Sequence, residues 1–331
     1  MVAGIALASN RNVRHRAVAS LAAALLASSC CRSISTLVDP YFRVAPAPNA
    51  QYSPPSAVAI VESTETWRDP TRNRDLPVRI YKPAASSRRL PIIIFSHGIG
   101  EDRDSYAYLG REWASRGFMA VHITHAGTDK AVLKQGYRKL YRATKLKENW
   151  INRPLDVTFV LDQLARRNDT DLDRVAVAGH SAGAFTALAV AGLKSESGDS
   201  LADPRVKAVI AISMPKMTGI VPPNGYDDIH VPVLHMTGTC DTSLIYRTFP
   251  RDRRVPFVSS RSTSPQYLVT LESVNHDTFS NAEDAAHPLI ARITTAFIEG
   301  FVLGDARARA WFDNGGLAAA GRLAVERKTV R

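Results

Sequence analysis

A serine flanked by glycines stands between a run typical of a buried strand and a run typical of a helix. The pattern G-x-S-x-G occurs as Gly179-His-Ser-Ala-Gly183. Residues 174–178 are mainly β-branched or small and apolar, as in a central parallel strand, and residues 184–193 are rich in Ala and Leu without Pro. Such a turn lifts the serine hydroxyl clear of the sheet. We predict that Ser181 is a nucleophile; the alternative is a small-residue helix start with Ser181 as its N-cap.

The rest of the chain repeats this alternation of strand-like and helix-like segments. Its 331 residues are 45% hydrophobic, enough for one large core, and contain no internal repeat. The expected strands are 57–62 and 76–81 as an antiparallel pair, then 91–95, 118–123, 174–178, 207–213, 232–238 and 266–272. The expected helices are 105–116, 154–167, 184–193, 289–303 and 305–311. The order predicts one α/β domain with a mostly parallel sheet and helices on both faces.

Two further residues follow strand-like runs in the order that a serine nucleophile requires. A serine hydroxyl needs a base to take its proton, and the base needs a carboxylate to hold its tautomer. Asp241 follows the strand 232–238 and a Gly-containing loop, and His276 follows the strand 266–272. Because the carboxyl ends of parallel strands meet at one edge of a sheet, we predict Ser181, His276 and Asp241 as nucleophile, base and orienting acid.

Other residues of the right type remain as alternatives, although each has a less suitable position. The alternative acids are Asp227, Asp228, Glu272 and Asp277, which lie before a strand, within one, or beside the base. The alternative bases are His122, His125, His230, His235 and His287.

The oxyanion of an acyl-transfer intermediate needs two fixed hydrogen-bond donors. One is expected to be the backbone N–H of Ala182, directly after the nucleophile. The other is expected to be the N–H of Ile99, because Gly98 allows a close turn after the strand 91–95. His97 either stiffens this loop through its side chain or is a buried histidine without a catalytic part.

The first 31 residues have the composition of an export signal. Arg11, Arg14 and Arg16 precede an apolar stretch, 17–27, which is too short to span a bilayer as a mature helix. Ser28-Ser-Cys-Cys31 then supplies small residues for cleavage. We expect an exported protein that is secreted, periplasmic or anchored through a lipid on Cys30; the alternative is an unstructured tail in the cytosol.

The cysteines predict no disulfide, and the expected domain limits follow from composition. If Cys30 and Cys31 leave with the signal or carry lipid, Cys240 is the one cysteine left and is expected to be a small buried residue. No Cys/His spacing indicates a metal. We expect a signal at 1–31, a Pro-rich linker or wrapping arm at 32–56, the catalytic domain at 57–320 and a basic tail at 321–331. The residues after Gly316 are expected to fray.

A basic segment interrupts the alternation. Residues 128–147 contain seven Lys or Arg and one acid, Asp129. Their apolar residues fall at helical spacing, which favours a cap over the active site, a surface that meets anionic lipid, or an ordinary helix with a solvated charged face. The net charge of +11 by itself identifies no partner, and nothing indicates nucleic-acid binding.

Several motifs together resemble the α/β-hydrolase superfamily, most closely the dienelactone-hydrolase-like and platelet-activating-factor-acetylhydrolase-like esterases. These motifs are Ser96-His-Gly-Ile99, Ala114-Ser-Arg-Gly-Phe118, Asn152-Arg-Pro-Leu-Asp156, Phe159-Val-Leu-Asp-Gln-Leu164 and Gly179-His-Ser-Ala-Gly183. The resemblance implies an eight-stranded, mostly parallel sheet and a Ser–Asp–His triad. It also implies oxyanion donors at Ile99 and Ala182, and no cofactor. Ala184 stands where many members have a second glycine, and Ser181 stands where dienelactone hydrolases have cysteine.

The expected function is hydrolysis of a small-molecule or lipid carboxylic ester through an acyl-enzyme. An amidase or peptidase, an acyltransferase on the same triad, and a non-catalytic binding protein on this scaffold remain as alternatives.

Overall fold

The fold is an α/β sandwich built on a single large sheet. The computed structural model describes residues 31–243, 247–280 and 283–328. The strands are β1 Ile60–Asp69, β2 Arg74–Pro83, β3 Leu90–Ser96, β4 Met119–Ile123, β5 Thr170–His180, β6 Val206–Ile212, β7 Val233–Cys240, β8 Gln266–Asn275 and β9 Leu323–Lys328. The helices are α2 Ile34–Leu37, α3 Ala107–Ser115, α4 Lys130–Lys134, α5 Tyr137–Ala143, α6 Lys147–Ala165, α7 Ala182–Ala189, α8 Val255–Ser259, α9 His287–Phe301 and α10 Ala306–Asp313, with short 3₁₀ turns at Asp252–Arg254, Asp277–Phe279 and Leu317–Ala319.

The described strands form one nine-stranded sheet in the order β1-β2-β4-β3-β5-β6-β7-β8-β9. The central strands β4, β3, β5, β6, β7 and β8 run parallel, whereas β1, β2 and β9 pair antiparallel with their neighbours. The mostly parallel α/β fold is therefore confirmed, and so is the antiparallel pair at its start. The expected count of eight strands is wrong by one.

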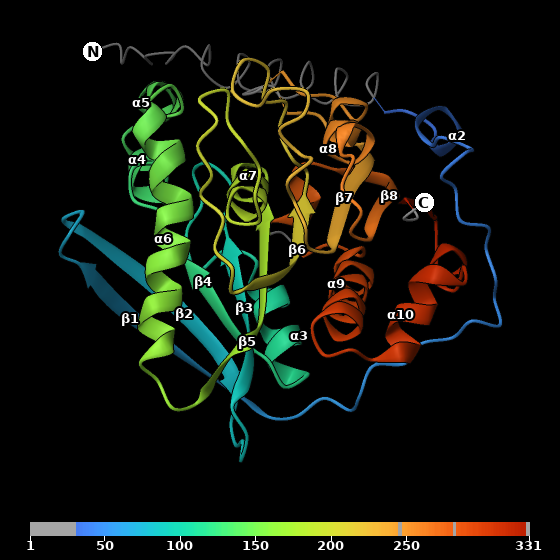
Figure 1. Ribbon diagram of the computed structural model, residues 1–331, viewed down its shortest axis with the longest axis horizontal. Coiled ribbons are helices and arrows are strands. Elements are labelled where there is room, and N and C mark those ends of the chain that lie inside the picture. The colour runs from blue at the N-terminus through green and yellow to red at the C-terminus, as the bar shows by residue number, and fades with distance from the viewer. Residues whose placement is uncertain (1–30, 244–246, 281–282, 329–331) are drawn as a thin grey trace, which may run out of the picture.

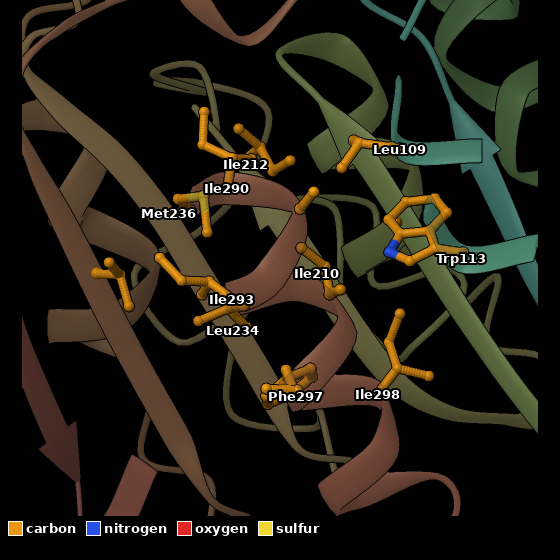
Figure 2. Packing of buried hydrophobic residues seen from close by; sticks show 14 of the residues in the cluster. Leu109, Trp113, Ile210, Ile212, Leu234, Met236, Ile290, Ile293, Phe297 and Ile298 are labelled. Carbon is orange, nitrogen blue, oxygen red and sulfur yellow. The ribbon is translucent and has the colours of Figure 1, made fainter. Parts of the chain in front are cut away.

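Helices cover both faces of the sheet because the central strands are apolar on both sides. Along β6, Ile210 and Ile212 face the layer of α3 and α9, while Val209 and Ala211 face the layer of α6 and α7. Figure 1 shows these two layers, and Figure 2 shows α9 packed on β6 and β7 through Ile290, Ile293 and Phe297. This alternation buries every residue of β3 and β4.

Strand β9 shows that the expected fraying after Gly316 is wrong for residues 323–328. Leu323, Ala324 and Val325 are buried, and β9 pairs with β8 along its length. Glu326, near the end of β9, is also buried and forms an ion pair with Arg254. Residues 323–328 form a strand because they pair with the otherwise open edge of β8. The apolar run Leu323–Val325 is short and lies between basic residues, so the sequence did not predict a strand here.

The N-terminal segment is a wrapping arm. The Val44 N–H donates to the Val325 carbonyl at 2.8 Å, and the ring of Tyr52 is buried against Trp311. In Figure 1 the arm, drawn in blue, runs beside α10 and on towards β1. It therefore closes the β9 side of the sheet.

The arm also carries a disulfide that corrects the cysteine prediction. Cys31 is bonded to Cys240 at the end of β7, 209 positions away. The Arg32 N–H donates to the Thr239 carbonyl beside this bond. Cys240 is therefore not a lone buried thiol, because the arm returns to the sheet at this point. The signal expected within 1–31 and a lipid on Cys30 lie outside the described residues, apart from Cys31.

Helix α6 begins earlier than expected. We placed Pro154 near the first turn, but it lies inside a helix that starts at Lys147. An interior proline removes one helical hydrogen bond. Asn149, Arg153 and Asp156 on the same helix are buried on both sides of this proline in the sequence. No helix among the described residues is both long and apolar enough to cross a membrane.

Candidate active site

Ser181 occupies a strained turn between β5 and α7. Its φ of 55° and ψ of −117° lie where residues other than glycine are rarely found. The flanking glycines are sterically required: a Cβ at Gly183 would lie 1.8 Å from the Ser96 carbonyl oxygen, and one at Gly179 would lie 2.1 Å from the Gly183 oxygen. The sequence therefore folds into the strand-turn-helix geometry that its motif predicts.

The structure brings the three predicted residues Ser181, His276 and Asp241 together. His276 Nε2 lies 3.2 Å from Ser181 Oγ, and His276 Nδ1 lies 2.8 Å from Asp241 Oδ1. They follow the carboxyl ends of β5, β8 and β7. Because an ionised carboxylate can only accept, the imidazole Nδ1 carries the proton and the Nε2 lone pair faces the serine hydroxyl.

Asp241 is a fully buried carboxylate with hydrogen bonds on both oxygens. Its Oδ2 accepts from the hydroxyls of Ser213 at 2.6 Å and Thr237 at 2.8 Å. Its Oδ1 accepts from His276 and lies 3.1 Å from Arg253 Nη2. Burial alone would raise the pKa of Asp241, but the Arg253 charge and these hydrogen bonds outweigh it and hold the pKa below the ordinary value. The carboxylate stays ionised, as an orienting acid must.

Arg253 is a site residue that sequence reasoning missed. Its side chain is buried, and it also donates to the Ser213 carbonyl at 2.7 Å and the Met214 carbonyl at 3.1 Å. Its Nη2 lies 3.1 Å from His276 Nδ1, so guanidinium and imidazole share one carboxylate oxygen. It comes from the short turn Asp252–Arg254. Arg254 beside it is also buried and pairs with Glu326, and no pattern in the sequence shows which arginine faces Asp241.

The two predicted oxyanion donors are backbone N–H groups that have no acceptor among the described residues. Neither the Ile99 N–H nor the Ala182 N–H donates to another described residue. Ile99 lies in the loop of residues 97–101 after β3, which we call the oxyanion loop after its predicted role. Two hydrogen bonds fix this loop: His97 Nδ1 donates to the Gly98 carbonyl at 2.6 Å, and the Gly100 N–H donates to the Thr128 carbonyl at 2.8 Å. The predicted stiffening by His97 is therefore present. His97 Nε2 accepts from the His125 N–H, and burial lowers the His97 pKa, so the ring is neutral.

The alternative acids and bases are occupied elsewhere or exposed. Asp227 accepts from the Arg261 N–H, Asp228 pairs with Lys194, Glu272 pairs with Arg322, and Asp277 and His230 are exposed. His122 contacts the Ser105 carbonyl, His125 contacts Asp156, His235 contacts Gln266, and His287 contacts the Thr278 carbonyl.

A second hydrogen-bonded chain runs beside the first. Tyr106, itself at φ 61°, donates to Glu101 Oε2 and accepts from His180 Nδ1 at 2.7 Å. Glu101 Oε2 also accepts from the Gly98 N–H at 2.9 Å, and the His180 ring lies 4.5 Å from that of His276. Burial raises the pKa of Glu101 to about 7. These hydrogen bonds link the oxyanion loop to His180, the residue before Ser181. In the sequence, the histidine within G-x-S-x-G is the one sign of this arrangement.

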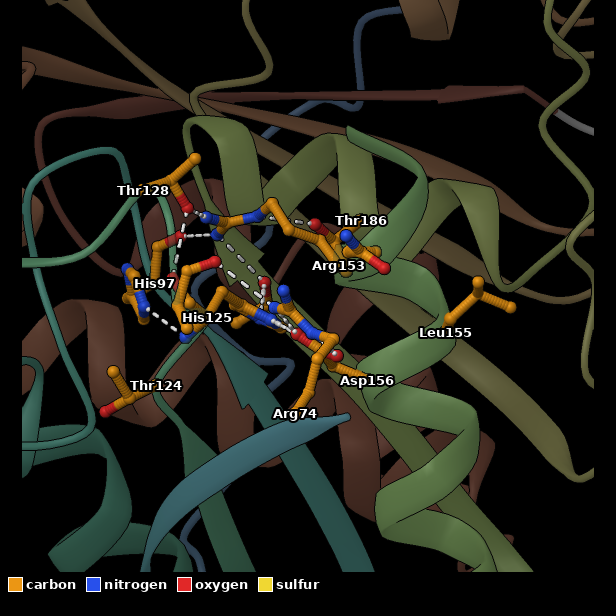
Figure 3. Close-up of polar contacts among 12 residues, drawn as sticks. Arg74, His97, Thr124, His125, Thr128, Arg153, Leu155, Asp156 and Thr186 are labelled. Atoms are coloured by element: carbon orange, nitrogen blue, oxygen red, sulfur yellow. Dashed lines mark hydrogen bonds and ion pairs between the residues drawn. The ribbon is translucent and has the colours of Figure 1, made fainter. Parts of the chain in front are cut away.

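A buried polar network supports the oxyanion loop from below (Figure 3). Arg153 donates to the His97 carbonyl and to Thr128 Oγ1, the latter at 2.8 Å. Asp156, one turn along α6, accepts from His125 Nδ1 at 3.0 Å and pairs with Arg74 and Arg72. Burial would raise the Asp156 pKa, but its cationic partners and His125 lower it instead. The motif Asn152–Asp156 is therefore a scaffold for the loop after β3.

No set of three or more His, Cys, Asp or Glu among the described residues is arranged to hold a metal ion. The described site contains a serine, an imidazole, carboxylates, the Arg253 guanidinium and backbone N–H groups.

The chain is similar to known hydrolases over part of its length. It is 31% identical to the hydrolase LUC6 of a Fusarium species over 42% of this chain and 30% of that protein. It is 29% identical to the 20-hydroxy-prefusarin hydrolase FUS2 of Gibberella moniliformis over 47% of this chain and 34% of that protein. It is 27% identical to the platelet-activating factor acetylhydrolase of Cavia porcellus, over 34% of each chain. The chain thus spans about a third of the length of these relatives.

The family model for chlorophyllase matches residues 56–226, just over half of the chain. This range includes β1 to β6, the oxyanion loop and the serine turn. The predicted resemblance is confirmed at this level, and the protein belongs to the chlorophyllase family, a branch of the α/β-hydrolase superfamily.

Proposed function

We propose that this protein is a serine hydrolase that cleaves carboxylic esters through an acyl-enzyme. The observation that carries the proposal is the continuous contact from Ser181 Oγ through His276 to Asp241. The names of the relatives add support, since LUC6 and FUS2 are called hydrolases and the Cavia protein an acetylhydrolase.

The geometry supports a two-step reaction. Ser181 Oγ attacks the ester carbonyl carbon while His276 Nε2 takes its proton, and the N–H groups of Ile99 and Ala182 stabilise the oxyanion. The imidazolium returns this proton to the leaving alcohol as the C–O bond breaks. His276 then takes a proton from water, which attacks the acyl-enzyme, and the acid leaves as Ser181 regains its proton. Asp241 stays ionised and stabilises the imidazolium.

A labelling experiment tests this function. The protein is incubated with a fluorophosphonate and separately with p-nitrophenyl esters of graded acyl length. We expect covalent labelling and ester turnover, both lost in Ser181→Ala and both kept in the matched control Ser197→Ala on an exposed loop. Labelling without turnover would indicate acyl transfer or an amide substrate, and absence of labelling would indicate a non-catalytic binding protein.

We also propose that the protein is exported, either secreted, periplasmic or lipid-anchored. Residues 1–30 carry the features of an export signal, and we propose cleavage before Cys31 because this residue forms the disulfide to Cys240. Disulfides persist mainly in oxidising compartments, which supports export. Cell fractionation and mass spectrometry of the mature N-terminus test this. A lipid-modified N-terminus lost in Cys30→Ser supports anchoring, an unmodified one supports secretion, and an uncleaved cytosolic chain contradicts export.

A further inference from the structure

The basic segment folds into two short helices and the first turn of a third. Helix α4, helix α5 and the start of α6 lie at the same end of the molecule as the carboxyl ends of β5 and β6 (Figure 1). Leu140 on α5 points inward and is buried. We call the outward surface of residues 134–151 the basic patch.

The basic patch exposes large apolar side chains. Tyr137 is 78% exposed and Tyr141, one turn further along α5, is 51% exposed. Leu146 and Ile151 are 49% and 50% exposed. Isolated exposed apolar residues are ordinary, but here four of them lie within fifteen consecutive positions.

The cations of the patch lack acidic partners. Within the described part of the chain, none of Lys134, Arg138, Lys139, Arg142, Lys145 and Lys147 forms an ion pair. Lys145 lies over the Tyr141 ring at 4.8 Å, and Lys139 hydrogen-bonds to Gln135. Elsewhere many surface arginines are paired, as Arg79 is with Glu62 and Asp104. Residues 134–151 contain six Lys or Arg and one acid, the exposed Glu148, so the net charge of the patch is strongly positive.

The patch is the outer side of a layer that covers the oxyanion loop. A Cβ on Gly100 would lie 3.1 Å from Leu140 Cδ2 and 3.3 Å from Leu133 Cδ2, so both leucines pack onto the loop. The Lys130 N–H donates to the Glu101 carbonyl at 3.0 Å. A surface bound to the patch would consequently lie close to the loop that carries Ile99.

We propose that the basic patch docks this protein onto an anionic lipid surface. Exposed tyrosines beside Lys and Arg on a short amphipathic helix suit the bilayer interface, where the aromatic rings enter the headgroup region and the cations meet anionic lipid. A soluble anion would be recognised by the charges but would leave the four apolar side chains in water. The inference rests on the proposed function only for its consequence, which is that a lipid ester reaches Ser181 from the membrane.

Vesicle co-sedimentation tests the docking. The full chain carries Ser181→Ala throughout, so that no lipid is hydrolysed. It is mixed with phosphatidylcholine vesicles or with vesicles that also contain phosphatidylglycerol. We expect binding to the anionic vesicles that weakens as salt is added.

The patch variant is R138E/K139E/R142E, all on the exposed side of α5. The matched control is R88E/R89E/R166E, which changes the net charge equally. These arginines are exposed, form no ion pair with a described residue, and lie at the amino ends of β3 and β5, away from the patch. Each basic residue near an anionic bilayer strengthens binding about fivefold. Loss of three of them alone weakens binding about a hundredfold, so the charge-reversed patch variant should bind at least about a hundredfold more weakly. The control should bind as the parent does.

A second variant, Y137S/Y141S, tests the apolar part without a change in charge. It should bind anionic vesicles more weakly and keep the thermal unfolding of the parent. Equal losses in the patch variant and its control, equal binding to neutral and anionic vesicles, or binding to a nucleic-acid duplex in place of vesicles would each overturn the proposal. Turnover of a soluble ester by the wild type is measured separately, so its absence would reject the esterase without touching the docking result.

Discussion

Arg253 and Asp241 form an ion pair in which neither side chain is exposed to water. Their closest atoms, Nη2 and Oδ1, are 3.1 Å apart, and Oδ1 is the oxygen that also orients His276. The position of the imidazole thus depends on how two buried charges balance.

Replacing Arg253 by Met should destabilise the protein strongly. Removing one partner of a buried pair leaves the other charge uncompensated, at a cost of about 3–5 kcal/mol in the free energy of unfolding. Urea unfolding measures this. The exposed neighbour Arg251 is the control, and Arg251→Met should change stability by no more than about 0.5 kcal/mol. Equal effects of the two changes would show that the pair contributes nothing particular.

Asp156→Asn should also lower stability by about 3–5 kcal/mol, because Arg72 and Arg74 would lose their buried counter-charge. Asp162→Asn on the same helix is the matched control. Asp162 is 53% exposed where it pairs with Arg205, and such surface pairs contribute about 1 kcal/mol or less. Chemical denaturation of both variants checks the contrast, which a similar loss in each would contradict.

The disulfide should stabilise the folded protein. Joining Cys31 and Cys240 closes a loop of 209 positions, and losing such a bond costs about 2–5 kcal/mol. Cys31→Ser/Cys240→Ser should melt at a lower temperature than the wild type. A reductant should lower the melting temperature of the wild type to that of the double variant, and should leave the melting temperature of the double variant unchanged. A wild type insensitive to reductant under unfolding conditions would contradict the bond.

Glu101 should make stability depend on pH in the unusual direction for a carboxyl. Its pKa rises from 4.5 to about 7 on folding because it is buried. Between these values the folded state binds more protons than the unfolded state, so stability is full below about pH 4.5 and falls as pH rises towards 7, by roughly 3 kcal/mol.

Glu101→Gln should remove this dependence, since the amide oxygen still accepts from the Gly98 N–H and does not titrate. Unfolding measured across this pH range checks the result. Glu148→Gln, at an exposed position on α6, should leave the pH profile as in the wild type. If the profile of Glu101→Gln also matched the wild type, another group would be responsible.

Much of the fold could be predicted because parallel strands carry a strong local signal. Strands such as Pro91–Phe95 are buried on both faces and read as continuous apolar runs, and the intervening helices show their own period. The geometry around Ser181, Asp241 and His276 could be expected for a related reason. Residues that follow parallel strands converge at one edge of the sheet, so the positions of these three residues after strands were sufficient to predict that they meet. Their catalytic roles stay predictions until the variants above are tested.

Only the tertiary structure decided which distant segments contact each other. The Arg253 guanidinium beside Asp241, the Glu101–Tyr106–His180 chain and the Cys31–Cys240 bond have no periodic pattern, because each depends on where two unrelated turns meet. Strand β9 belongs with them: its residues become a strand because the open edge of β8 accepts their hydrogen bonds. By itself the sequence determined the layers of the fold and the strand ends where the site lies, since these follow from local hydrophobic patterns. The charges that surround the site were decided by packing.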